Sequence, residues 1–291
     1  MADATPAGGI DWIASYPKSG NTWMRLLLTA YFADDGAYDL AAALTARGAS
    51  SCRLFEDALG ISCDDLLPQE ARILQPAMYR VLAARYPEGL WLKVHDRQAM
   101  LGEAGWLFPP EASGSAVYII RNPLDVAVSN AFHDGHGDMD RAVAKLCSAD
   151  TRLGGRGDQQ LAQYPGDWSG HVRSWVDQRD IRVLALRYED MLADAGAVLA
   201  RVIGFARPQV AIDPGRIARA VALSRFDALQ AAEDRRRFGE TPDGTVRFFR
   251  QGKAGDWRHH LSPAQVTRLC LQQGDVMRRF GYGAEDEGAG C

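Results

Sequence analysis

The chain has 291 residues, of which 47% are hydrophobic and 24% are charged, and its formal net charge at pH 7 is −4. This length supports a substantial hydrophobic core, and the slight acidic excess argues against a protein whose whole surface is basic for binding nucleic acid. No apolar run approaches the roughly 20 residues that a membrane-spanning helix needs. Residues 1–11 also lack the charged and apolar regions of a signal peptide, so we expect a cytoplasmic protein without nucleic-acid or membrane partners.

Strand-like and helix-like hydrophobic patterns alternate along the chain. The predicted strands are residues 10–16, 90–94, 116–121 and 181–187. The predicted helices are residues 21–32, 68–85, 123–133, 138–148, 169–178, 189–203, 214–222, 224–232 and 263–279. This alternation predicts an α/β fold with a central, mainly parallel sheet that is flanked by helices on both faces. Because ligands in such sheets bind beyond the carboxyl ends of the strands, that edge should carry the functional site.

The domain organisation is predicted to be simple. No linker-like stretch divides the chain, so we expect a single domain over residues 10–282. Residues 1–9 and the acidic, glycine-rich residues 283–291 should be flexible ends. Residues 153–160 and 235–257 are rich in glycine and charge and are predicted to be long loops.

The segment YPKSGNTW, residues 16–23, ends the first predicted strand and opens the first helix. Backbone N–H groups, the helix N-terminus and the Lys18 ammonium would converge there, which suits an anion, and Gly20 permits a tight turn. The architecture is that of a nucleotide-binding P-loop. The ATP signature G-x-x-x-x-G-K-[ST] is nevertheless absent, because Lys18 precedes the single glycine. On this segment alone, an ordinary strand–turn–helix with a solvated lysine is an open alternative.

Lysine is scarce in this chain. Of 33 basic residues only four are lysine, namely Lys18, Lys93, Lys145 and Lys253. Since arginine supplies nearly all the surface charge, a lysine here indicates a need for a compact, point-like ammonium. Lys18 and Lys93 both lie at or just beyond the ends of predicted strands, where a ligand is expected.

Two further segments carry basic side chains in suggestive places. In RNPLDVAVSNAFH, residues 121–133, Arg121 ends a strand, Asp125 lies in the first helical turn, and Ser129 follows two turns into the helix. In RFFRQGKAGDW, residues 247–257, cations are interleaved with glycines, as in a loop that closes over an anionic ligand. Each segment alone is also compatible with a local salt bridge or a solvated basic loop.

Together these segments resemble the motifs of the PAPS-dependent sulfotransferases, which move a sulfuryl group from 3′-phosphoadenosine 5′-phosphosulfate (PAPS) to an acceptor. YPKSGNTW is similar to that family's 5′-phosphosulfate loop, RNPLDVAVSNAFH to its 3′-phosphate segment and RQGKAGDW to its C-terminal R-x-G-x-x-G-D-W loop. LKVHD, LRYEDM and SRFDAL resemble its catalytic K-T-H, Y-E-D and T-S-F segments, so the resemblance covers roughly residues 10–280 in the expected order. The opening WIASYPK is similar to that of the cytosolic small-molecule enzymes and of bacterial antibiotic-tailoring relatives.

The resemblance implies PAPS as the sulfuryl donor, 3′,5′-bisphosphoadenosine (PAP) as the product, a small-molecule acceptor with a hydroxyl group, and no metal. It implies that the turn after the first strand holds the 5′-phosphosulfate, that the basic segments hold the 3′-phosphate, and that aromatic side chains surround the adenine. The residues implied to bind the donor are Lys18, Ser19, Gly20, Asn21, Thr22, Trp23, Arg121, Ser129, Tyr188, Ser224, Phe226, Arg250, Gln251 and Gly252.

The catalytic residues that the resemblance implies are Lys18, Lys93 and His95. Sulfuryl transfer is an in-line displacement in which charge builds on the bridging oxygen and spreads over the peripheral oxygens. Lys18 would stabilise the bridging oxygen and Lys93 the sulfuryl oxygens. His95 would accept the acceptor's proton, because its unperturbed pKa lies near neutrality, and strand alternation puts residues 93 and 95 on the same side. The remaining histidines are predicted to be surface or loop residues: His133, His136, His171, His259 and His260.

The acceptor pocket is the least patterned part of the sequence. After His95 the chain carries Asp96 and Arg97, where phenol-sulfating relatives have an apolar Leu-Pro pair. This difference indicates a polar or cationic acceptor, unless the two side chains pair with each other. The resemblance favours a natural product or glycoside of bacterial secondary metabolism. The candidates for lining the pocket are Phe55, Asp96, Trp106, Phe132, Tyr164 and Phe248.

The same residues bear on two alternative functions and on the oligomeric state. A P-loop kinase of a metabolite or nucleoside is disfavoured because Lys18 precedes Gly20 and no Mg²⁺-binding acidic motif ends a strand. A non-catalytic nucleotide-binding relative is disfavoured because the two lysines and the histidine are intact. The family's dimer motif K-x-x-x-T-V-x-x-x-E is not matched by residues 258–267, so a homodimer stays an open alternative.

Overall fold

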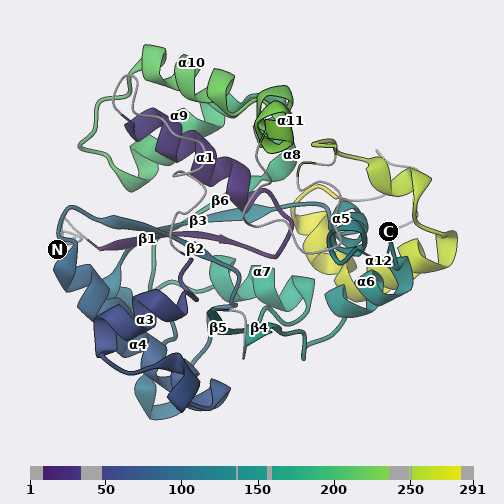
Figure 1. Ribbon diagram of the computed structural model, residues 1–291. Coiled ribbons are helices and arrows are strands. Elements are labelled where there is room, and N and C mark those ends of the chain that lie inside the picture. Colours follow the sequence, from purple (N-terminus) through teal and green to yellow (C-terminus); the bar gives the residue numbers. More distant parts are fainter. Residues whose placement is uncertain are drawn as a thin grey trace.

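The computed structural model describes residues 9–33, 48–135, 137–155, 159–235, 249 and 251–282. Four parallel strands form the central sheet, in the order β2 (Leu90–Val94), β1 (Ile10–Ser15), β3 (Ser113–Ile120) and β6 (Val183–Arg187). The predicted parallel sheet is therefore confirmed. β1 lies between β2 and β3, so the turn that follows β1 opens at the centre of the carboxyl edge (Figure 1).

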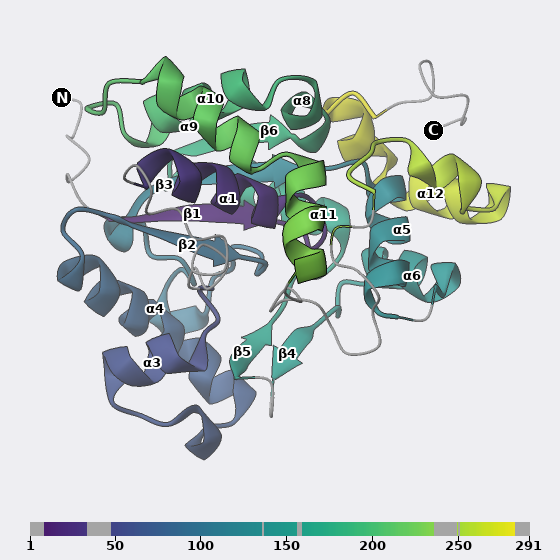
Figure 2. The ribbon, with the colours of Figure 1, turned by 45° about the horizontal axis from the view of Figure 1, so that its top comes forward.

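Helices cover both faces of the sheet, as predicted (Figure 1). On one face lie α1 (Asn21–Phe32), α8 (Tyr188–Ala193), α9 (Ala195–Ala206) and α10 (Pro214–Leu223). On the other lie α3 (Cys52–Leu59), α4 (Pro68–Arg85) and α7 (Trp168–Val176). Beyond the strands' carboxyl ends lie α5 (Pro123–His133), α6 (Met139–Leu146), α11 (Phe226–Arg235) and α12 (Pro263–Arg279), and Figure 2 shows α5 and α11 near the end of β1.

Successive side chains of β1 point to opposite faces of the sheet, and each face packs into its own hydrophobic core. Trp12 packs with Tyr79 and Phe108, each at a ring-centroid distance of 4.9 Å, in the core under α4 and α7. Ile13, the next residue, belongs to the opposite core, which contains Met24 of α1. Because both faces of the strand are buried, all six residues of β1 are inaccessible to solvent. This double burial fixes the register of β1 and thereby the position of the turn that follows it.

Three parts of the fold differ from the prediction. α3 lies in a region for which no helix was predicted, and the helix predicted over 189–203 is two helices, because the Asp194 side chain accepts a hydrogen bond from the Ala197 N–H and starts α9 anew. The loop predicted at 153–160 contains a two-stranded hairpin, β4 (Leu153–Gly155) and β5 (Gln160–Gln163). Among the described residues, no helix combines the length and apolarity needed to cross a membrane.

Candidate active site

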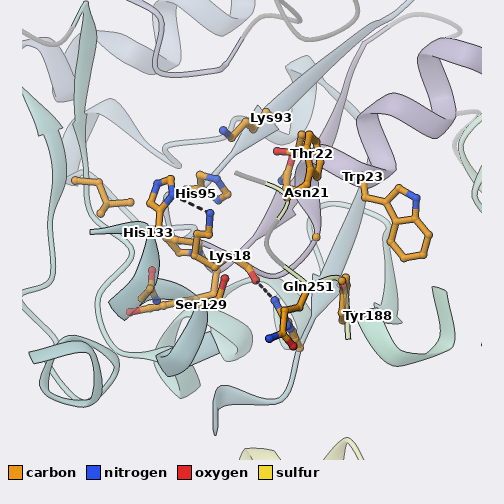
Figure 3. A pocket seen from close by; sticks show the side chains of 18 of the residues that line it. Lys18, Asn21, Thr22, Trp23, Lys93, His95, Ser129, His133, Tyr188 and Gln251 are labelled. Atoms are coloured by element: carbon orange, nitrogen blue, oxygen red, sulfur yellow. Dashed lines mark hydrogen bonds between the residues drawn. The ribbon is translucent and has the colours of Figure 1, made fainter. Parts of the chain in front are cut away.

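A cavity of about 860 Å³ opens beyond the carboxyl end of β1. Its walls come from the turn after β1, the residues that end β2, the helices α5, α8 and α11, the β4–β5 hairpin, and residues 251–253. Figure 3 shows the side chains that the turn, β2 and α5 direct toward one another. The structure thus brings many of the predicted site residues together at this edge.

The turn after β1 has an unusual backbone. Lys18 has φ of 69° and Gly20 has φ of 101°, and a non-glycine residue with positive φ is uncommon and tends to occur at functional sites. Asn21 holds the turn closed, since its Nδ2 donates to the Ile13 carbonyl at 2.6 Å. Gly20 is required sterically as well, because a Cβ there would lie 2.6 Å from Cδ2 of Tyr188. The turn is therefore built for a close backbone approach and a single lysine.

Lys18 is held from two sides. Its Nζ lies 3.0 Å from Nδ1 of His133, and its carbonyl oxygen accepts a hydrogen bond from Nη1 of Arg121 at 2.9 Å (Figure 3). His133 was predicted to be a surface or loop residue, and this was wrong: it is half-buried and lines the cavity. The sequence signal that could have located it is its spacing of four from Ser129, which puts both on one face of α5.

The end of β2 carries Lys93 and His95 into the same cavity. Burial alternates along this segment: Leu92 and Val94 are buried, whereas Lys93 and His95 are only partly covered, as the alternation predicted. Nδ1 of His95 lies 2.9 Å from the Ser15 carbonyl oxygen. Because a carbonyl only accepts, this contact places the proton of a neutral His95 on Nδ1 and leaves Nε2 as the basic nitrogen.

His171 supports the backbone at His95. It is fully buried, which contradicts the prediction of a surface or loop residue, and its Nε2 donates to the His95 carbonyl at 3.1 Å. The Tyr118 hydroxyl lies 2.7 Å from its Nδ1. Burial lowers the pKa of His171 to about 3, so the ring is neutral at any physiological pH.

Arg121 joins the turn to the C-terminal loop. Its Nη2 donates to the Lys253 carbonyl at 3.2 Å, and its guanidinium lies 4.4 Å from the centroid of the Tyr188 ring. Ser129, Gln251 and Gly252 line the cavity beside it. These residues bring together the parts of the sequence that were implied to bind a 3′-phosphate. Arg250, the remaining candidate there, lies outside the described residues.

Asp125 anchors the C-terminal loop, a role that the sequence prediction missed. Its Oδ2 accepts from the Gly255 N–H at 2.7 Å and its Oδ1 from the Trp257 N–H at 3.0 Å. The carboxylate is 2% exposed and bridges the first turn of α5 to a 3₁₀ turn at Asp256–His259. The loop position that presents Gln251 and Gly252 therefore depends on this side chain.

The far end of the cavity is aromatic. Nε1 of Trp23 donates to the Ser224 carbonyl at 3.0 Å, and its ring meets the Tyr188 ring edge-on at a centroid distance of 5.9 Å. Phe226 covers Gly252, where a Cβ would lie 2.4 Å from the ring. The sequence-predicted residues Trp23, Tyr188, Ser224 and Phe226 thus line one wall, which suits a planar base.

The acceptor candidates are not brought to the cavity. Phe55 is 0% exposed inside the core, and Trp106, Phe132 and Tyr164 are half-buried elsewhere, with Tyr164 stacked under the Arg72 guanidinium at 4.2 Å. These side chains were selected for being large and apolar, and in the structure such side chains mostly fill the core. Phe248 lies outside the described residues, as do most residues of the loop predicted at 235–257.

Asp96 has a different role from the one predicted. It is 3% exposed, its Oδ1 lies 2.8 Å from Nη1 of Arg72, and the same oxygen accepts from the Tyr164 N–H at 2.7 Å. Burial raises the pKa of this carboxyl, and the nearby Arg72 opposes that rise. The salt bridge is therefore made with Arg72 rather than with Arg97. A direct contact between Asp96 and a cationic acceptor is not supported by this geometry.

No metal-binding cluster of three or more His, Cys, Asp or Glu side chains occurs in the part of the chain that the structure describes. Several buried polar atoms in or beside residues of the cavity have no hydrogen-bond partner among the described residues, among them Oγ of Ser19, Nε of Arg121 and Oγ of Ser224. Such atoms are costly in a dry interior and are commonly satisfied by a ligand.

A phosphate-loop turn at the carboxyl edge of a parallel sheet, facing a histidine and basic side chains, defines a P-loop-like group-transfer site. The chain belongs to the sulfotransferase domain family, whose model matches residues 11–281. It is 23% identical to the rat sulfotransferase 1 family member D1 over 270 residues, covering 88% of this chain and 79% of that protein. It is 26% identical to the mouse sulfotransferase 2A2 over 168 residues, covering 53% of each. The match thus spans about half the length of mouse sulfotransferase 2A2 and of rat sulfotransferase 2A6.

Two solved structures share the fold. The crystal structure of mouse sulfotransferase SULT7A1 complexed with PAP superposes with a TM-score of 0.58 at 18% identity, covering 93% of this chain and 85% of that one. Retinol dehydratase in a complex with retinol and PAP gives a TM-score of 0.58 at 23% identity, covering 94% and 82%. The P-loop-like architecture predicted from the sequence is confirmed by this likeness.

Proposed function

We propose that the protein transfers the sulfuryl group of PAPS to a hydroxyl group of a small-molecule acceptor in the cytoplasm. The observation that carries the proposal is that Lys18, Lys93 and His95, which come from the ends of two adjacent strands, line one cavity with Arg121. This is the set that an in-line displacement needs: cations for the bridging and peripheral oxygens and a base for the attacking hydroxyl.

The donor fits the residues that are present. The aromatic wall around Trp23 and Phe226 suits adenine, and Arg121 with Ser129 and the glycine-containing loop suits a 3′-phosphate. The hydroxyl groups of Ser19 and Ser224, which have no hydrogen-bond partner in the described part of the chain, suit a ligand rich in oxygen. The volume of about 860 Å³ lies toward the upper end of the roughly 300–1,000 Å³ typical of ligand pockets, which favours two reactants bound together.

The chemistry follows from the hydrogen bonds. Nε2 of His95 takes the acceptor's proton, because Nδ1 is committed to the Ser15 carbonyl. Lys18, whose ammonium lies 3.0 Å from Nδ1 of His133, donates to the bridging oxygen of the departing PAP. Lys93 neutralises charge on the transferring sulfuryl group. The relative named 3-beta-hydroxysteroid sulfotransferase supports a hydroxyl group as the acceptor, and the similarity of WIASYPK to antibiotic-tailoring enzymes supports a natural product or glycoside that carries it.

The proposal is tested by supplying PAPS with a panel of alcohols, phenols and glycosides and measuring PAP and the sulfated product by mass spectrometry. His95→Asn should lower kcat about 10²- to 10⁴-fold while leaving PAP affinity unchanged, since a general base acts on the acceptor's proton. The exposed His259→Asn is the matched control and should behave like wild type. Consumption of ATP with magnesium, without use of PAPS, would instead identify a kinase.

A further inference from the structure

The cavity has two chemically different halves. The half around Trp23 and Phe226 is aromatic, whereas the other half is polar and carries amide side chains together with charged ones such as Lys93, Asp134 and Lys145. The β4–β5 hairpin contributes Leu153, Gly154, Gln160 and Gln163 to this polar half, so two of its three lining side chains are amides. We call the set Asn130, Gln160 and Gln163 the amide wall.

The hairpin is tied directly to the strand end that carries His95. The Tyr164 N–H donates to Oδ1 of Asp96 at 2.7 Å, and the Arg97 N–H donates to the Tyr164 carbonyl at 3.4 Å. Gln163 directly precedes Tyr164 in the chain, and His95 directly precedes Asp96. The hydrogen bond between Tyr164 and Asp96 therefore links the neighbours of these two cavity residues. Asp96, whose carboxylate also binds Arg72, thus acts as a positioning residue that links the hairpin residue Gln163 to the strand end that carries His95.

The other end of the hairpin is tied to Lys93 through one short segment. The Leu161 N–H donates to the Ser50 carbonyl at 2.7 Å, and the Ala49 N–H donates to the Lys93 carbonyl at 2.8 Å. Since β5 is linked to Lys93 of β2 through residues 49 and 50, and the residue after β5 is linked to Asp96 just beyond β2, the hairpin is fixed beside the cavity.

The amide wall has hydrogen-bonding capacity that the described protein does not use. Gln163 is 6% exposed, and the one hydrogen bond of its side chain among the described residues runs from Nε2 to Oε1 of Gln160 at 3.2 Å. The acceptor oxygen of Gln163 has no such partner. The side-chain amide of Asn130, which lies one helical turn before His133 on α5, makes no hydrogen bond to any described residue. Amides left unsatisfied in a closed site weaken the binding of an apolar ligand.

We propose that the acceptor is a polyhydroxylated, sugar-like molecule and that Gln163 and Asn130 select it by hydrogen-bonding hydroxyl groups adjacent to the one that is sulfated. This inference rests on the proposed function. A site built to bind hydroxyls rejects analogues that lack them by about 10⁴-fold, because its polar groups are then left unpaired. An apolar alcohol would therefore be a poor acceptor even though its own hydroxyl could reach His95.

The sulfuryl transfer forms one bond, breaks one bond and moves one proton. The acceptor oxygen forms a bond to sulfur as the bond between sulfur and the bridging oxygen of PAPS breaks, and PAP leaves with that electron pair. The proton of the acceptor hydroxyl passes to Nε2 of His95. Gln163 and Asn130 take part in neither bond; they orient the ring so that one hydroxyl is in line with the sulfur.

The test uses the full chain with PAPS and three probes: methyl β-glucoside, 4-nitrophenol and a steroid alcohol. We expect transfer to the glycoside. Gln163→Leu should lower kcat/KM for the glycoside about 10- to 100-fold, mainly through KM, which is the loss expected for one or two hydrogen bonds. PAP affinity measured by calorimetry should stay unchanged. Gln272→Leu, at an exposed position of α12, is the matched control and should leave all values as in wild type.

The outcomes separate this inference from the proposed function. A protein that does not bind PAP refutes the proposed function itself. If PAP binds, the inference is overturned by transfer to the phenol or the steroid without transfer to the glycoside, and equally by failure to sulfate the glycoside at millimolar concentration. Equal kcat/KM for the glycoside in Gln163→Leu and wild type would also overturn it.

Discussion

Replacing Asp125 with alanine removes the acceptor for two backbone N–H groups at once. The carboxylate binds the Gly255 and Trp257 N–H groups at 2.7 and 3.0 Å and is 2% exposed. A buried donor left unsatisfied costs about 1–3 kcal/mol, so the two together cost about 2–6 kcal/mol unless the loop moves to reach water. Either response displaces residues 251–253 from the cavity. We therefore expect a lower free energy of unfolding and at least tenfold weaker PAP binding, which corresponds to about 1.4 kcal/mol.

The assay for Asp125→Ala pairs urea unfolding with calorimetric titration of PAP at 10 °C, where a destabilised protein is still folded. Asp213→Ala is the control, because Asp213 also accepts from two N–H groups, those of Gly215 and Arg216, but at the exposed start of α10. It should cost about 0.5–2 kcal/mol of stability and leave PAP affinity intact. A folded Asp125→Ala protein that binds PAP as tightly as wild type would refute the anchoring role.

Two further predictions follow from the geometry. Gly20→Ala should abolish measurable PAP binding, because the new Cβ would lie 2.6 Å from the Tyr188 ring. Gly60→Ala is the control, because Gly60 also has positive φ but no atom lies within 4 Å of its Cβ position. This control should lose only about 1–2 kcal/mol of stability. Because burial lowers the pKa of His171 to about 3, the unfolded chain takes up a proton near pH 6.5 that the folded protein does not. As the pH falls from 6.5 to 3, the free energy of unfolding should therefore decrease by up to about 1.4 kcal/mol per pH unit. In urea unfolding measured across this pH range, His171→Asn should remove the part of the pH dependence that His171 causes. An unchanged slope would contradict the assignment of a buried, neutral His171.

The features that were predictable from the sequence are those with a local cause. The doubly buried strands, the helix that opens at Asn21 and the turn with one lysine and one glycine all follow from short-range pattern, and each lies where it was predicted. The alternation that brings Lys93 and His95 to one side is equally local. Most residues that the resemblance assigns to the donor line the cavity, because they belong to such segments.

The features that were missed depend on contacts between distant parts of the chain. The β4–β5 hairpin exists in a glycine-rich segment because Ser50 and Asp96 bind its backbone. The same holds for Asp125, whose partners lie 130 and 132 residues away. Large apolar residues such as Phe55 were chosen for the acceptor pocket, and the core takes most such side chains regardless of function. Spacing along one segment carries no information on such pairings, so the side of the cavity that the β4–β5 hairpin forms could not be predicted.

The central claim is that this cavity binds a nucleotide through its 3′-phosphate. The most direct test is calorimetric titration of the protein with PAP, AMP and ATP in the absence of magnesium, repeated with Arg121→Ala. We predict clear preference for PAP over both other nucleotides, and loss of that preference in the variant, because Arg121 lies between the turn at Lys18 and the loop at Lys253. Equal or tighter binding of ATP would contradict the account and favour a kinase.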